Sequence, residues 1–116
     1  MANKAGVEDA VMVHKTEIVF CDKTTDKSRF KHYRLNAGNI EKIIFDYVER
    51  KTFFGLRKEL EERIIFKVKD EDIPEELVVL EHNEPNFRRY RGGIRSFVDD
   101  NKVALEIYDA EGKRQS

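Results

Sequence analysis

The sequence predicts an α+β domain built mainly from a bent antiparallel sheet or a partly open barrel, with one C-terminal helix. Three observations support this fold class. The chain has 116 residues, a length typical of one domain. Most of its apolar residues form short blocks rich in β-branched and aromatic side chains, as strands do. One late segment, residues 86–99, instead repeats its apolar residues at helical spacing.

The composition favours a soluble, cytoplasmic chain. There are 22 Lys+Arg against 23 Asp+Glu, and a net charge of −1 argues against a protein that coats nucleic acids. The one cysteine, Cys21, has no partner for an internal disulfide. No apolar run approaches the roughly 18 residues of a membrane span, and residues 1–9 carry acids and a glycine where a signal peptide needs apolar residues.

The N-terminal part predicts an arm followed by a hairpin. We expect a flexible arm at residues 1–10, a single domain over residues 11–109 and a polar tail at residues 110–116. Residues 13–21 are rich in β-branched side chains and predict a strand. A polar turn follows, and residues 29–35 then form the second strand of the hairpin.

Residues 40–54 admit two interpretations. Ile40, Ile43, Ile44 and Tyr47 fit one face of a helix, which Asn39 would cap. However, nine of the fifteen residues are β-branched or aromatic, which favours a strand. We favour the strand. The helix would instead give the alternative fold, a ββαββαβ sandwich.

The second half of the chain predicts two more strands before the helix and one after it. A charged linker leads into a strand at residues 63–69, and residues 77–80 form a short strand inside an acidic run. Asn86 is placed to cap the helix, which a glycine pair at 92–93 weakens, and alternation from Val103 predicts a last strand. The expected core contains Ile18, Phe20, Ile43, Phe45, Ile64, Phe66, Val78, Leu80, Tyr90, Ile94 and Phe97.

The sequence contains no pattern typical of catalysis or metal binding. The three histidines are isolated, and neither H-x-x-x-H, C-x-x-C, G-x-S-x-G nor a phosphate-binding loop occurs. We therefore expect no enzyme, no metal and no cofactor. The alternative is a small enzyme whose acid and base residues are dispersed along the chain.

Two clusters of basic residues are candidate binding sites. The segment 23–34 has five basic residues against one acid, a pattern suited to holding anionic groups. Its anion-binding candidates are Lys23, Lys27, Arg29 and Lys31. Arg88, Arg91 and Arg95 share one side of the expected helix and are candidates for a partner surface. The acidic run 70–84, with seven acids and no Lys or Arg, is the alternative partner for these arginines.

The order of elements resembles bacterial PH-like domains. The resemblance covers residues 15–105 and rests on apolar patterns: I-E-K-I-I-F at 40–45, K-T-F-F-G-L at 51–56, I-I-F-K-V at 64–68, and the helix with its N-K-V ending at 101–103. In phosphoinositide-binding members the first hairpin carries a lysine and then a basic residue, any residue and an arginine. Here Lys23 and R-F-K at 29–31 are similar, with Lys31 where arginine is usual.

The resemblance implies a non-catalytic binding or scaffolding module. Its ligand would be an anionic lipid headgroup or a protein partner. The edge strands of a small sheet also expose backbone groups that can pair with another chain unless they are covered or flanked by charges. Residues 77–80 carry no such charge. We therefore expect self-association through this strand.

Overall fold

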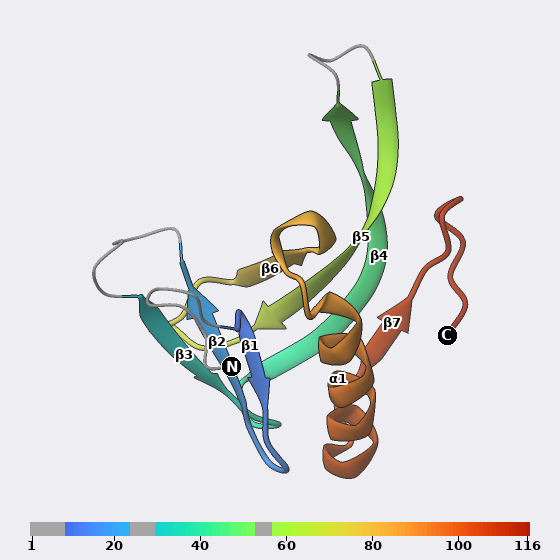
Figure 1. The fold of residues 1–116 in the computed structure, drawn as a ribbon. Helices are drawn as coiled ribbons and strands as arrows, with labels where there is room; N and C mark the ends of the chain where they lie inside the picture. Colours follow the sequence, from blue (N-terminus) through green and yellow to red (C-terminus); the bar gives the residue numbers. More distant parts are fainter. Residues whose placement is uncertain (1–8, 24–29, 53–56) are drawn as a thin grey trace.

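The computed structural model describes residues 9–23, 30–52 and 57–116. These residues form two sheets and a C-terminal α-helix, which confirms the α+β class (Figure 1). The sheets are not closed into a barrel. No helix in the described part of the chain is long and apolar enough to cross a membrane.

The first sheet contains β1 (Val11–Val13), β2 (Ile18–Asp22) and β3 (Lys31–Leu35), all antiparallel. Pairing of β2 with β3 confirms the expected hairpin. A single strand over residues 13–21 is wrong, because the chain turns at residues 14–17. The four residues of this turn are polar, and the His14 N–H donates to the Glu17 carbonyl at 2.8 Å.

The second sheet has the order β6-β5-β4-β7. It contains β4 (Ile40–Thr52), β5 (Arg57–Val68), β6 (Glu76–Leu80) and β7 (Leu105–Ile107). The strand interpretation of residues 40–52 is confirmed, while the helix and the sandwich that it implied are wrong; residues 53–54 lie outside the described residues. In Figure 1, β4 and β5 form a long curved ribbon that extends beyond the helix.

The expected charged linker before residue 63 is part of β5. One of its acids, Glu59, lies opposite Arg50 of β4 at 3.7 Å, and just beyond the linker Arg63 lies opposite Asp46 at 2.7 Å. Opposite charges on paired strands stabilise a sheet modestly. This segment is therefore a strand with a polar surface.

The buried side of β6 is the reverse of the expected one. Leu77 and Val79 are buried, whereas Val78 is 41% exposed and Leu80 is half-buried. The reason is the register, because Leu77 lies opposite Phe66 of β5 and Val79 lies opposite Ile64, both of which face the core. The other nine expected core residues are buried.

The helix α1 (Phe87–Asn101) follows a short 3₁₀ turn, η2 (Glu81–Asn83). It continues through the glycine pair, and its expected apolar face is buried: Phe87, Tyr90, Ile94, Phe97 and Val98. Asn86 occupies the N-cap position, but its side chain makes no capping hydrogen bond; it donates to Asp9 Oδ1 at 2.8 Å. The helix ends at Asn101, and its C-cap residue, Lys102, has a left-handed backbone conformation (φ 58°).

Both described ends of the chain contact the domain. Ala10, at the end of the expected arm, is buried in the core. In the expected tail, the Gln115 N–H donates to the Ile107 carbonyl at 2.6 Å, and Arg114 pairs with Tyr108 in an isolated bridge.

The C-terminal strand β7 is parallel to β4, in a sheet that is otherwise antiparallel.

Candidate functional site

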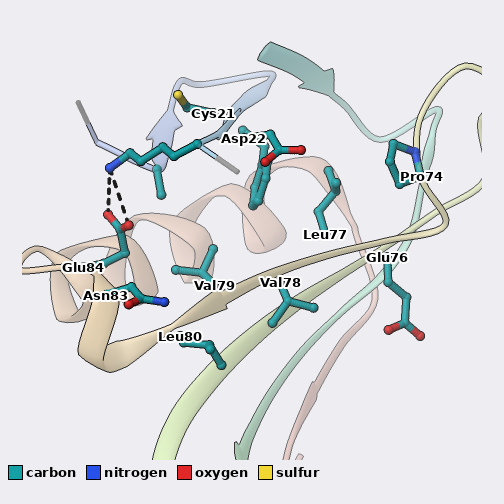
Figure 2. A pocket seen from close by; sticks show the side chains of 13 residues that line it. Cys21, Asp22, Pro74, Glu76, Leu77, Val78, Val79, Leu80, Asn83 and Glu84 are labelled. Carbon is teal, nitrogen blue, oxygen red and sulfur yellow. Dashed lines mark hydrogen bonds and ion pairs between the residues drawn. The ribbon is translucent and has the colours of Figure 1, made fainter. Parts of the chain in front are cut away.

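A groove of about 730 Å³ lies between β6 and the end of β2 (Figure 2). Its volume falls within the roughly 300–1,000 Å³ of small-ligand pockets. One wall is β6, and the opposite wall is Ala10 with residues 20–23. The ends of the lining are Pro74 on one side and Asn83 with Glu84 on the other.

Within the described part of the chain, β6 is an edge strand with no neighbour on the side away from β5. The Val68 N–H donates to the Glu75 carbonyl at 2.8 Å. In an antiparallel pair, this bond determines which residues of β6 direct their N–H and C=O toward β5 and which direct them away. Every second residue of β6 therefore directs its N–H and C=O away from β5: Glu76, Val78 and Leu80. Among the described residues, no backbone group pairs with them there.

The side chains of β6 line the groove from both faces of the strand. Figure 2 shows Leu77 and Val79 on one side of β6 and Glu76, Val78 and Leu80 on the other. Leu77 and Val79 belong to the core, as does Phe20 on the opposite wall. The groove therefore combines an apolar floor with a free strand edge, the two features that bind extended peptides.

A buried carboxylate closes one end of the groove. Glu84 is 8% exposed, and Lys23 Nζ lies 3.4 and 3.5 Å from its two oxygens, as the dashed lines in Figure 2 mark. The Tyr90 hydroxyl lies 3.2 Å from Glu84 Oε1. These contacts are longer than the roughly 2.7–2.9 Å of a strong ammonium–carboxylate hydrogen bond.

Tyr90 connects this carboxylate to the start of the described chain. Its hydroxyl accepts the Ala10 N–H at 3.0 Å and lies 3.2 Å from Asp9 Oδ1. Arg89 also pairs with Asp9, at 3.0 Å. Burial raises the pKa of the Tyr90 hydroxyl, and the nearby Glu84 and Asp9 carboxylates raise it further.

The structure places two of the four anion-binding candidates. Lys23 forms the ion pair with Glu84, and Lys31 is exposed, with its Nζ 5.3 Å from the centre of the Tyr33 ring. Lys27 and Arg29 lie outside the described residues. Anion binding by this hairpin therefore stays a prediction, with Lys23 already held by a carboxylate.

The three helix arginines are in different surroundings. Arg91 pairs with Glu62 of β5 and lies over the Phe45 ring, with 4.7 Å between its Cζ and the ring centre. Arg88 lies 3.7 Å from Glu62 and 4.0 Å from Glu81, and Arg95 is exposed. Acidic residues thus lie beside Arg88 and Arg91: Glu81 belongs to the acidic run 70–84, whereas Glu62 belongs to β5.

A second buried carboxylate, Glu61, has a structural explanation. It accepts the His82 N–H at 3.0 Å, and His82 Nδ1 lies 2.6 Å from its Oε2. In return, Glu81 Oε1 accepts the Glu62 N–H at 3.1 Å. The carboxylates of Glu61 and Glu81 thus provide hydrogen bonds between β5 and the residues that follow the end of β6.

Sequence reasoning missed the residues at the closed end of the groove. Glu84 is the last residue of the acidic run 70–84, whose residues are expected to be exposed to solvent. The residues next to it in the sequence do not indicate that it is buried. Tyr90 was expected in the core, but the contacts of its hydroxyl were not expected. One of them is with Asp9, which lies 81 positions away in the sequence. Within residues 9–23, 30–52 and 57–116, no three His, Cys, Asp or Glu side chains are grouped to hold a metal ion.

Comparison of the chain with protein-family models, with curated proteins and with solved structures yields no match. The resemblance to bacterial PH-like domains therefore stays a prediction.

Proposed function

We propose that the protein is a non-enzymatic binding module whose groove takes an extended segment of a partner protein as an added strand on β6. The observation that carries the proposal is the open edge of β6, which lines the groove along the whole strand. An added strand would satisfy the outward backbone groups of Glu76, Val78 and Leu80 and place alternate side chains on the apolar floor.

The lining favours binding over catalysis. The described lining contains no histidine, and its cysteine, Cys21, is buried. Two of its carboxylates are in ion pairs, Glu76 with Lys67 and Glu84 with Lys23. Carboxylates that are held in ion pairs can orient a charged ligand and discriminate between ligands.

The shape of the groove favours a single extended chain as the occupant. Residues 20–23 form a wall opposite β6, so the strand edge is approached through a channel. One peptide segment fits between two walls more readily than the edge of a second folded copy does. A second copy of this chain is therefore the other outcome that the experiment has to recognise.

The test is selection from a random peptide library displayed on phage, followed by titration of the synthesised peptides into ¹⁵N-labelled protein. We expect the largest amide shifts at residues 76–80 and 20–23. Val78→Pro should abolish binding without unfolding the domain, because the Val78 N–H points away from β5 and proline is tolerated at a strand edge.

Val78→Thr is the matched control, because it keeps the N–H and the β-branched shape and should retain binding. Peptides that bind Val78→Pro as well as wild type, or that shift amides elsewhere, would overturn the proposal. Failure to select any peptide would overturn it too. Concentration-dependent shifts at residues 76–80 without peptide would identify a second copy as the occupant.

A further inference from the structure

We propose that the occupant of the groove carries a lysine or arginine side chain that binds Glu84 and displaces the ammonium of Lys23. This inference rests on the proposed function and specifies the chemistry of the partner segment. It assigns the closed end of the groove as a cation subsite.

The first support is the state of the Glu84 carboxylate. A carboxylate this deeply buried needs strong hydrogen bonds to offset the loss of water. Among the described residues, Lys23 and Tyr90 contact it at 3.2 Å or more, and Tyr90 also lies 3.2 Å from Asp9. Since the tyrosine has one proton for two carboxylates, Glu84 has capacity for a better donor.

The second support is that Lys23 is free to leave. Its side chain is 29% exposed and comes from the residue after the end of β2. A lysine is a flexible point charge with a strongly hydrated ammonium, so it regains water when it leaves the carboxylate. A ligand cation that arrives along β6 would replace a long ion pair with a shorter one.

The third support is the charge of the groove. Its described lining contains three carboxylates and one ammonium: Glu84 pairs with that ammonium, of Lys23, and Glu76 pairs with Lys67 outside the lining. The loop that leads into β6 adds further exposed acids, Glu71, Asp72 and Glu75. These exposed loop carboxylates attract a basic segment, which is the opposite of what an anion site at Lys23 requires.

The two interpretations of Lys23 therefore predict opposite effects of the same substitution. An anion site would lose affinity in Lys23→Met. A cation subsite at Glu84 would gain affinity, because the internal competitor of the ligand is gone. The substitution also leaves Glu84 without its ammonium, so a basic peptide should restore thermal stability to the variant.

The experiment uses N-acetylated peptides from the library selection, each made with its basic residue and with norleucine in that place. We expect the selected peptides to share a lysine or arginine at one position, and norleucine to weaken binding to wild type about tenfold. The same swap should have no effect on Glu84→Gln. Lys23→Met should bind the basic peptide several-fold tighter than wild type.

Lys42→Met is the matched control. Lys42 is 31% exposed and pairs at 3.1 Å with Glu106, a mostly buried carboxylate away from the groove. This variant should bind the basic peptide as wild type does. If Lys23→Met does not fold, Lys23→Arg replaces it, and its guanidinium should hold Glu84 more firmly and weaken peptide binding.

The outcomes separate this inference from the proposed function. Peptides that bind at β6 without a basic residue, or whose preference for one survives Glu84→Gln, overturn the cation subsite and leave strand addition intact. Unchanged or weaker binding of the basic peptide by Lys23→Met also overturns the subsite. Loss of all peptide binding, with residues 76–80 unperturbed, overturns both.

Discussion

The hydroxyl of Tyr90 is the point at which the N-terminal segment, the helix and the closed end of the groove meet. It accepts the Ala10 N–H and lies at equal distance, 3.2 Å, from Asp9 and Glu84. Because it can donate to one of these carboxylates at a time, each needs a cation or amide of its own. Arg89 lies 3.0 Å from Asp9, whereas Lys23 lies 3.4 Å from Glu84.

Tyr90→Phe should lower the free energy of unfolding by roughly 1–3 kcal/mol, because the buried Ala10 N–H loses its acceptor and Asp9 and Glu84 lose the one donor that they share. Urea denaturation measures this change. Tyr108→Phe is the control, since the Tyr108 hydroxyl donates to Glu106 at 2.8 Å but is far less buried. Equal losses in the two variants would contradict the role assigned to Tyr90.

Tyr90 also makes stability depend on pH in the alkaline range. Its pKa in the folded protein is raised above the ordinary value of about 10, so its contribution is complete below that value and is lost as the pH rises toward the folded pKa. Denaturation at pH values above 10 should therefore show a steeper loss of stability in wild type than in Tyr90→Phe. Parallel curves would contradict this expectation.

The strand β6 shows how far a local pattern determines structure at the scale of an element. Residues 77–80 are four consecutive apolar residues, so the strand was predicted correctly, but no alternation shows which face is buried. Pairing of Leu77 with Phe66 decides this and turns Val78 outward. The sequence of β6 alone does not show its register against β5, and this register decides the buried face.

The helix shows the opposite case, in which a local pattern was sufficient. The spacing of Phe87, Tyr90, Ile94 and Phe97 predicted both the element and its buried face. The glycine pair did not interrupt it, because four apolar anchors on one face outweigh a propensity cost of about 1 kcal/mol per glycine.

Gly92→Ala should stabilise the protein by about 1 kcal/mol, since a Cβ at this position meets nothing within 4 Å and the helix gains propensity. Thermal or urea denaturation measures the gain. Gly93→Ala is the paired comparison and should gain less, because its Cβ would lie 3.4 Å from Val13 of β1. A loss of stability in Gly92→Ala would show that the helix requires glycine there.

At the scale of the whole molecule, the fold class was predictable and the groove was not. Blocks of β-branched residues predict strands, and apolar residues at helical spacing predict one helix. These elements give an α+β domain regardless of which strands pair with one another. The groove depends on where β2 ends relative to β6, two strands in different sheets and more than 50 residues apart. The net charge of −1 likewise does not show that the acidic residues gather in the run 70–84 and the basic ones in the segment 23–34.

Self-association and the proposed strand addition need the same backbone groups of β6, so one should exclude the other. Any dimer formed through residues 77–80 should disappear in Val78→Pro and should dissociate when a selected peptide is added. Sedimentation velocity over a range of protein concentrations measures both effects. A dimer that persists in Val78→Pro uses another surface, and a strict monomer at high concentration would show the expected self-pairing to be wrong, while leaving the edge of β6 available to a peptide.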